Sequence, residues 1–484
     1  MVQFMYQNKG LYMNVLLTGA NGYIGRRLKH RLLEDDNVKL KILVRNKSSL
    51  LNKLDNVEVV EGSSFDLDSL RKALSGVDVA YYFIHSLTSQ NYQELDKQSA
   101  KNFLDIALEC GVKKIIYLGG LGEKESASTH LISRIETGEI LSSSPDKIQT
   151  LWFRAGVIIG SGSASFEIIR NITQKLPIMI TPKWVSTLAQ PIGVDDVIEY
   201  LYQGLYLDNK ENLIVDIGSE QMSYKDMMEN TARVMGLERK LIPVPFLSPK
   251  ISSYWLTFFT PVPFNVASSL VEGLKSKVVI QNDNAMRFFA IKPKSFKDSV
   301  AQALKEIEEN QVISRWSDSS GDMWEKDHTK DIANAVFTDR QIRDISNMDK
   351  EKVFEAFMCI GGQNGWFGYD WLWSLRGFID KLLGGYGTNR GRRDQCMVRI
   401  GDSLDFWKVV DVKENERLLL YAQMKLPGRA WLEFIIKDGK LIQTAYFYPN
   451  GLWGRIYWYL LIPAHWLIFR NMIDNLLKKA STLR

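Results

Sequence analysis

The residues best suited to chemistry form a glycine-rich junction close to the N-terminus. An apolar run, residues 15–17, breaks into three glycines, and a segment with helical periodicity follows. Glycines suit a junction at which the chain turns sharply, a pyrophosphate approaches the backbone, and a helix packs close to a strand with its N-terminal amides facing the phosphates. We therefore predict a strand, a tight turn and a helix that bind a dinucleotide. The predicted cofactor-binding residues of the junction are Thr18, Gly19, Asn21, Gly22, Tyr23, Ile24 and Gly25.

A second apolar segment, residues 40–44, supports this prediction, because glycines alone occur in any tight turn between a strand and a helix. It follows the junction at about the 20-residue spacing of dinucleotide-binding folds. It ends in Arg45, Asn46 and Lys47, where an NAD-selective site carries an acidic residue for the ribose 2′-hydroxyl. A cation at this place favours the 2′-phosphate of NADP, so NADP is predicted over NAD. The alternative is a solvated basic turn.

The glycine spacing, Gly-x-x-Gly-x-x-Gly, resembles that of the extended and atypical short-chain dehydrogenase/reductases. The resemblance implies a Rossmann-type fold, an NAD(P) cofactor and an oxidoreductase activity. Members usually carry Gly-Asp beside the adenine, whereas Gly62 is followed here by Ser63. A serine hydroxyl can still accept a hydrogen bond from the adenine amine, so Ser63 stays among the predicted cofactor-binding residues.

The resemblance also indicates where a reaction would occur. Reductases of this family use a Tyr-x-x-x-Lys pair after the fifth strand, in which the lysine lowers the pKa of the tyrosine and the phenol moves a proton while hydride crosses. His130 stands here in place of the tyrosine, Arg134 in place of the lysine, and Gly119 near the place of a serine. His130 can act as the proton donor, and Arg134 can hold cofactor ribose or phosphate. Equally, His130 can cap the helix or fill space.

His85 is the third catalytic candidate. It follows the fourth predicted strand, together with Ser86, at the sheet edge where ligands bind; Gly120 and Leu121 follow the fifth strand at the same edge. The alternative is that His85 only hydrogen-bonds its own turn.

Strands alternate with helices through the first half of the chain, which predicts an α/β fold with a doubly wound parallel sheet. We expect an N-terminal extension at 1–12 and an NAD(P)-binding domain at 13–315, with a small substrate or helical subdomain at about 160–290. The proline- and aromatic-rich residues 241–273 suit a substrate lid, a membrane-contacting surface or a small helical subdomain. Serines 161, 163 and 165 either meet a ligand or cap a helix.

A linker is predicted at 316–330, followed by a second domain at 331–484. Strands with two-residue alternation are expected there, closed by a long helix at 453–479. This α+β pattern resembles the helix-grip fold of START and polyketide-cyclase-like proteins, in which an antiparallel sheet wraps a C-terminal helix around an apolar cavity. The predicted strands are residues 397–400, 405–410, 417–422, 431–436 and 441–448.

The second domain holds two further sets of residues with more than one interpretation. Most of the 13 tryptophans lie in this last third of the chain, which fits a cavity for a flat or lipid-like ligand or a plain aromatic core. Arg390, Arg392 and Arg393 suit an anionic headgroup or a solvated loop.

Composition limits the function. A net charge of +5 over 484 residues, without a concentrated basic tail, argues against nucleic acid as a partner. Cys110, Cys359 and Cys396 are odd in number and far apart, which predicts neither a disulfide framework nor a metal site and fits a reducing cytoplasm.

Residues 456–469 are apolar but shorter than the roughly 20 residues that span a bilayer. They suit a buried or interfacial helix, so peripheral contact with the inner membrane stays open.

These predictions describe an NADP(H)-binding oxidoreductase that acts on a hydrophobic carbonyl or quinone-like substrate. Residues 15–477 resemble a bacterial group in which an atypical short-chain dehydrogenase is fused to a domain of unassigned function, and the first domain is also similar to an accessory subunit of respiratory complex I. The alternatives are a non-catalytic NADP(H)-binding redox sensor, similar to nitrogen-repressor-type NmrA-like members, and a scaffold whose second domain binds a lipid. The oligomeric state is left open.

Overall fold

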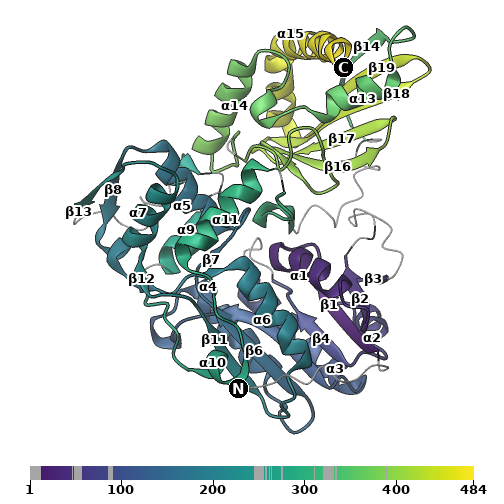
Figure 1. Cartoon of the computed structure of the whole chain (residues 1–484). Helices are drawn as coiled ribbons and strands as arrows, with labels where there is room; N and C mark the ends of the chain where they lie inside the picture. The colour runs from purple at the N-terminus through teal and green to yellow at the C-terminus, as the bar shows by residue number, and fades with distance from the viewer. Residues whose placement is uncertain are drawn as a thin grey trace. The chain divides into compact units, whose positions relative to one another are not determined.

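The structure of the protein is a computed structural model (Figure 1), which describes residues 12–45, 47, 57–85, 91–244, 256, 259–260, 262, 264–273, 276–309, 311–319, 332, 335–388 and 390–483. The chain forms two compact units: Met1–Trp255 with Asn265–Glu325, and Leu256–Phe264 with Lys326–Arg484. The domain boundaries drawn from the sequence stay predictions. Some predictions fall outside the described residues, namely those on Asn46 and Ser86, most of the N-terminal extension, most of the linker, and much of the proline- and aromatic-rich segment.

The first unit is built on a seven-stranded sheet with the order β11-β6-β5-β4-β1-β2-β3, and every neighbouring pair is parallel. The chain moves outward from β1 to β3 and then crosses back to β4, which is the order of a doubly wound Rossmann-type sheet. The predicted fold class is therefore confirmed. The strands are β1 Met13–Thr18, β2 Val38–Val44, β3 Val57–Glu61, β4 Val79–Tyr82, β5 Lys114–Gly120, β6 Gln149–Ala155 and β11 Leu213–Ile217.

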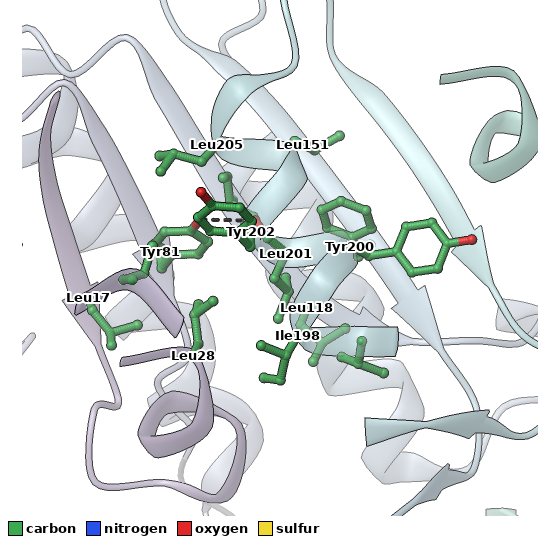
Figure 2. Packing of buried hydrophobic residues seen from close by; sticks show 14 of the residues in the cluster. Leu17, Leu28, Tyr81, Leu118, Leu151, Ile198, Tyr200, Leu201, Tyr202 and Leu205 are labelled. Atoms are coloured by element: carbon green, nitrogen blue, oxygen red, sulfur yellow. Dashed lines mark hydrogen bonds between the residues drawn. The ribbon is translucent and has the colours of Figure 1, made fainter. Parts of the chain in front are cut away.

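Helices cover both faces of this sheet because its strands alternate their buried side chains between two cores. Val15 and Leu17 of β1 point into one core, whereas Leu16 points into the other. The first core includes Leu28 of α1 and Leu201 of α6, and Figure 2 shows these side chains packed around Tyr81, whose hydroxyl donates to the Leu201 carbonyl at 2.9 Å. The covering helices are α1 Tyr23–Leu33, α6 Val194–Tyr206 and α10 Asn284–Phe288 on one face, and α2 Leu67–Leu74, α3 Tyr92–Glu109 and α4 Thr129–Leu141 on the other.

The junction between β1 and α1 requires glycine at two positions, because a Cβ atom would not fit at either of them. Gly19 has a φ of 64°, and a Cβ there would overlap the carbonyl of Phe83, which follows β4. A Cβ on Gly25 would overlap the Gly19 carbonyl oxygen and lie 2.8 Å from the Gly19 carbonyl carbon. The helix can therefore begin directly against the end of the strand, as the glycine spacing predicts.

The remainder of the first unit consists, within the described residues, of two-stranded pairs that are separate from the seven-stranded sheet and of further helices. Ser163 caps α5 by accepting from the Phe166 amide at 3.1 Å, which supports the capping interpretation of this serine. Arg27 of α1 is buried and donates to Ser161 and to Glu306 of α11, which ties these elements together. The elements are α5 Ala164–Lys175, α7 Tyr224–Val234, α9 Phe264–Gly273, α11 Phe296–Glu308, β7 Ile158–Ile159, β8 Ile178–Pro182, β9 Leu188–Ala189, β10 Ile192–Gly193, β12 Met222–Ser223 and β13 Lys240–Val244.

The second unit contains a six-stranded antiparallel sheet with the order β14-β19-β18-β17-β16-β15 and a long C-terminal helix. The predicted hairpin turn is confirmed, with Asp438 and Gly439 both at positive φ between β18 and β19. Its elements are β14 Phe337–Asp344, β15 Ser403–Leu404, β16 Trp407–Lys413, β17 Arg417–Ala422, β18 Gly428–Lys437, β19 Lys440–Pro449, α13 Lys350–Met358, α14 Asp370–Leu382 and α15 Gly451–Thr482.

Aromatic and aliphatic side chains pack between the sheet, α13 and the second half of α15. Trp366 stacks on Phe406 with ring centroids 6.1 Å apart, and Phe357 of α13 stacks on Phe434 of β18 at 5.7 Å. The predicted sheet and closing helix are confirmed, whereas the strand expected at 397–400 was wrong, because those residues form no strand. The likeness to the helix-grip fold and its cavity stays a prediction.

Two cysteines far apart in the sequence are joined in this unit, contrary to the prediction. Cys359, which follows α13, forms a disulfide with Cys396. The Asn364 side-chain amide holds the two segments together by donating to the carbonyls of Cys359 and Gln395, at 2.9 and 2.7 Å. The argument from cysteine spacing to a reducing compartment therefore loses its support.

The arginines between α14 and β15 are buried and paired inside the protein, so the expected solvated loop is wrong. Arg390 donates to Gln423 at 2.7 Å, and Arg392 donates to the carbonyls of Met358 and Ile360 at the end of α13. Burial lowers the pKa of Arg392 to about 10. These residues hold the second unit together rather than presenting a free cationic loop.

The β1–α1 junction yields a prediction about stability. Replacing Gly25 by Ala forces the backbone of the junction apart, because the added methyl meets main-chain atoms that cannot rotate away. We expect the free energy of unfolding to fall by about 1–3 kcal/mol, measured by urea denaturation. Gly273→Ala is the matched control, since a Cβ there lies 3.8 Å from its nearest neighbour, the Ser128 hydroxyl. Equal stabilities of the two variants would contradict the close packing of α1 on β1.

Candidate functional site

The candidate site lies at the carboxyl edge of the parallel sheet, where the strand order reverses between β1 and β4. Ligands of open α/β sheets bind at this position. Thr18 joins the two strands there: its hydroxyl donates to the Tyr81 carbonyl and accepts from the Phe83 amide, both at 2.9 Å. The hydroxyl of Thr18, a predicted cofactor-binding residue, is thus engaged in holding the strand ends together.

The N-terminus of α1 opens onto this edge. Gly22 is its N-cap residue, no side chain caps the helix, and its first turn carries no acidic residue. Such a helix end offers main-chain amides and a positive dipole to a phosphate. The junction therefore fits the pyrophosphate of a dinucleotide.

The side chains of Tyr23 and Ile24 point into the protein. The Tyr23 hydroxyl is buried, and burial raises its pKa well above the usual range; a Cβ on Gly160 would lie 2.7 Å from it. Ile24 packs against the first core, and the Asn21 carbonyl accepts from Arg26 at 3.1 Å. A cofactor role of Tyr23 and Ile24 would therefore use their main-chain amides.

The adjacent strands bring Arg45 and Ser63 to the same edge. Arg45 is exposed and directly follows β2. The Gly62 amide donates to the Val44 carbonyl at 2.9 Å, so the turn after β3 lies beside the end of β2. The Ser63 hydroxyl accepts from the Phe65 amide at 3.2 Å. Binding of NADP by these two residues stays a prediction.

A cluster of polar side chains stands beyond β4, and its centre is a buried carboxylate. His85 Nδ1 lies 2.9 Å from an Asp96 carboxylate oxygen, and the Ser133 hydroxyl donates to the same oxygen at 3.1 Å. Asp96, on α3, is only 3% exposed. With this carboxylate ionised, Nδ1 of His85 carries the hydrogen and Nε2 holds a lone pair. Nε2 is buried and has no hydrogen-bond partner within the described residues.

His130 and Arg134, both on α4, complete the cluster. The rings of His85 and His130 are stacked with centroids 5.0 Å apart. Arg134 donates to the Leu118 carbonyl near the end of β5, and its guanidinium carbon lies 5.7 Å from the centre of the Tyr117 ring. The fold therefore brings the three predicted catalytic candidates together. His85 precedes His130 by 45 positions in the sequence, whereas His130 and Arg134 lie one helical turn apart on α4.

Burial keeps both imidazoles neutral. Burial lowers the pKa of His130 to about 3, and the neighbouring His85 and Arg134 act in the same direction. Burial also lowers the pKa of His85, although its hydrogen bond to Asp96 opposes this shift. A histidine with so low a pKa carries no extra proton near pH 7, so the predicted donor role suits His130 poorly. His85, which Asp96 orients, is better placed to exchange a proton.

Gly119 has a packing role that the sequence did not reveal. A Cβ at this position, near the end of β5, would overlap the indole of Trp152. The residue therefore leaves room for a buried ring on the neighbouring strand, and its predicted cofactor contact stays a prediction.

Asp96 and Ser133 were missed by reasoning from sequence. Asp96 shares the buried face of α3 with Ser99, Phe103 and Ala107, at helical spacing. A carboxylate on the apolar face of a helix needs a partner, so this position carried a signal that could have been used. Ser133 has the ordinary appearance of a small residue on a buried helix face and carried none.

The parallel sheet and the β1–α1 junction define a first unit of the Rossmann type. Two family models match separate parts of the chain: residues 19–143 match a family described as NAD(P)H-binding, and residues 332–472 match a family described as a protein of unknown function (DUF2867). The first match contains the glycine junction, His85, Asp96 and Arg134.

Relatives and solved structures resemble the first unit. An NmrA-like family domain-containing protein of Dictyostelium discoideum is 33% identical over 107 residues, which cover 21% of this chain and 34% of that protein, so the chain spans about a third of that relative's length. The photosystem II assembly factor Ycf39 of Cyanophora paradoxa is 22% identical over 51% of this chain and 76% of its own length. The triphenylmethane reductase of Citrobacter sp. shares the fold, with 21% identity, a TM-score of 0.51, and 60% of this chain and 100% of that chain covered.

The lowered pKa of His130 yields a prediction about pH. The unfolded chain binds a proton at His130 below its ordinary pKa of about 6.5, whereas the folded protein resists protonation down to about 3. The free energy of unfolding should therefore fall as pH drops from about 6.5, by up to about 1.4 kcal/mol per pH unit for this residue. Urea denaturation of His130→Gln at several pH values should show a shallower fall than the wild type. The exposed His30 provides the control His30→Gln, and equal slopes in all three proteins would refute a neutral His130 in the folded protein.

Proposed function

We propose that the protein is an NADP(H)-dependent oxidoreductase that acts on a hydrophobic carbonyl or quinone-like substrate. The observation that carries this proposal is the pairing of His85 with buried Asp96 at the same sheet edge as the glycine junction. NADPH, when bound, supplies the hydride. The His85 Nε2 atom takes up a proton from the surrounding water and passes it to the substrate oxygen as the hydride is transferred, and Asp96 stabilises the imidazolium that forms in between. Arg134 supplies positive charge beside that oxygen.

The stacked imidazoles of His85 and His130 support an uncharged, flat substrate. Both rings are neutral near pH 7 and lie nearly parallel, with an interplanar angle of 26°. Two neutral aromatic faces favour a conjugated or apolar group over an anionic one. A substrate that carries several negative charges would need more cations than the one arginine that this cluster contributes.

Arg45 supports the preference for NADP. It follows β2 at the place where NAD-selective domains carry a carboxylate for the ribose hydroxyls, and it is exposed to a ligand approaching the sheet edge. A guanidinium pairs with the 2′-phosphate through charge-assisted hydrogen bonds. NADH lacks this phosphate and gains nothing from the residue.

Calorimetric titration with NADP, NADPH, NAD and NADH tests the cofactor. We expect NADPH to bind most tightly, and Arg45→Glu to weaken NADPH binding by about tenfold or more, with a much smaller effect on NADH. Lys39→Glu is the control, because it makes the same charge change near the start of β2, away from the carboxyl edge. Failure of all four nucleotides to bind would refute the proposed function. An equal loss in both variants would refute the role of Arg45.

Steady-state oxidation of NADPH by a series of quinones and hydrophobic aldehydes tests the chemistry. His85→Ala should lower kcat by about 100-fold or more while the affinity for NADPH changes little, because the residue moves a proton rather than holding the nucleotide. Added imidazole should restore part of the lost rate. Asp96→Asn should lower kcat and shift its pH profile, since it removes the charge that orients His85.

His30→Ala is the control for these variants, because His30 is exposed on α1. Full turnover by His85→Ala would exclude His85 as the proton carrier. His130→Ala separates the two histidines: a loss as large as that of His85→Ala, with imidazole rescue, would transfer the role to His130.

A non-catalytic NADP(H)-binding redox sensor is the second candidate function. The low pKa of His130, at the place of the family's tyrosine, favours this candidate, because the residue is unsuited to donate a proton. A sensor would bind NADP and NADPH with different conformations and consume neither. Nucleotide binding without turnover of any substrate in the series, together with different proteolysis patterns in NADP and NADPH, would support it.

A further inference from the structure

The second unit exposes large apolar side chains on two helices, α14 and α15. On α14, Trp371, Phe378 and Leu382 recur at helical spacing and are 64%, 52% and 57% exposed, while Trp373 and Gly377 on the opposite side are buried. The helix is thus apolar on both sides, although only one side packs on its own unit. Monomeric proteins rarely leave such a surface uncovered without a binding role.

The first half of α15 also exposes large apolar side chains. Trp453 and Leu460 are 76% and 75% exposed, whereas the inward-facing Trp458 packs against Phe337 and Phe447 of the sheet. The second half of the helix lies in the core of the unit. We call the exposed surface the α14/α15 face, which consists of Trp371, Phe378 and Leu382 of α14 and Trp453, Leu460 and Trp466 of α15.

One loop ties the two helices of the α14/α15 face together. The Lys425 amide donates to Asp380 at 2.6 Å, and the Lys425 carbonyl accepts from Arg376, both residues of α14. Two positions later, the Pro427 carbonyl accepts from the amide of Asn450, the N-cap residue of α15, at 2.9 Å. The two helices are therefore anchored on the same five-residue stretch between β17 and β18, which brings Arg376 and Asp380 of α14 near the N-terminus of α15.

The first half of α15 carries positive charge. From 451 to 473, α15 carries Arg455 and Arg470 and no carboxylate. Both arginines lie beside rings, Arg470 with its guanidinium carbon 5.4 Å from the centre of Trp466 and Arg455 5.9 Å from Phe337. On α14, Asp380 is fully buried, whereas Asp370 at the start of the helix is exposed. Tryptophan and tyrosine flanked by arginine are typical of segments that lie at the boundary between lipid headgroups and acyl chains.

We propose that the α14/α15 face docks the protein on the surface of a bilayer that contains anionic lipid. The tryptophans enter the interface, the leucines and Phe378 reach the acyl region, and Arg455 and Arg470 contact lipid phosphates. Within the described residues no helix combines the length and apolarity needed to cross a membrane, so the contact is a peripheral one. Docking goes beyond the proposed reaction and does not depend on it, although it would bring the enzyme to hydrophobic substrates dissolved in the lipid.

Sedimentation of the full-length protein with vesicles tests the proposal. Vesicles of phosphatidylcholine mixed with phosphatidylglycerol should bind the protein, and vesicles of phosphatidylcholine alone should bind it more weakly. The double variant W453S/L460E should lower binding to the mixed vesicles by about tenfold or more, because two large apolar groups no longer enter the interface. Arg455→Gln should cost about fivefold on the mixed vesicles and leave binding to phosphatidylcholine unchanged.

Met286→Glu is the matched control, since this residue of α10 is 75% exposed and lies in the first unit. All variants should keep the nucleotide affinity and the unfolding midpoint of the wild type, because the substituted side chains face outward. Absence of binding to mixed vesicles would overturn the proposal. It would also be overturned if W453S/L460E converted a dimer to a monomer in analytical ultracentrifugation while vesicle binding stayed unchanged, because a second copy would then cover the face. The experiment measures binding to lipid, so its outcome does not depend on whether the protein turns over a substrate.

Discussion

The structure of the first unit depends on how closely three pieces of backbone approach one another at the end of β1. The carbonyl of Gly19 lies where a side chain on Gly25 would stand, and Gly19 itself presses against the carbonyl of Phe83. This contact sets the position of α1 on the sheet and, with Thr18 bridging to β4, aligns the two strand ends between which a ligand of this fold binds. This alignment positions the N-terminal amides of α1, the cluster around His85 and Asp96, and the end of β2 at one edge of the sheet.

Burial of charge organises the rest of the candidate site. Asp96 of α3 is buried and hydrogen-bonds His85 and Ser133 of α4, so its carboxylate can fix the tautomer of His85. The same burial removes the charge from His130, which leaves Arg134 as the cation of the cluster. The second unit uses buried arginines differently: Arg390 and Arg392 satisfy side-chain and main-chain oxygens between α13, α14 and the sheet, and thus stabilise loops that carry few aliphatic residues.

The two units differ in how they use aromatic residues. In the first unit the rings of Tyr81, Phe153 and Tyr200 belong to the cores that flank the sheet. In the second, Trp366, Trp373 and Trp407 form a packed core, whereas Trp371, Trp453 and Trp466 stay outside. Under the proposed function and the proposed docking, the first unit would bind the nucleotide, and the exposed aromatic side chains of the second unit would contact the lipid that dissolves the substrate.

The sequence by itself determined most of the elements and the glycine junction between β1 and α1, because both depend on local features. The apolar period of residues 13–18, the glycines after it and the alternation of 428–449 each specify an element from its own residues, so the parallel sheet, the hairpins and the closing helix could be predicted. The strand expected at 397–400 did not form, because the main-chain amides of Met397 and Arg399 donate to the carboxylates of Asp394 and Asp402 rather than to a neighbouring strand. Only the tertiary structure decided which side chains meet. Asp96 contacts His85, Cys359 is bonded to Cys396, and Arg390 and Arg392 donate to buried oxygens. Each of these contacts joins segments that are distant in the sequence, so no local sequence pattern predicts it. The outward side of α14 and α15 was likewise fixed only by packing, since an apolar helix shows no preferred side until one of its faces has been covered.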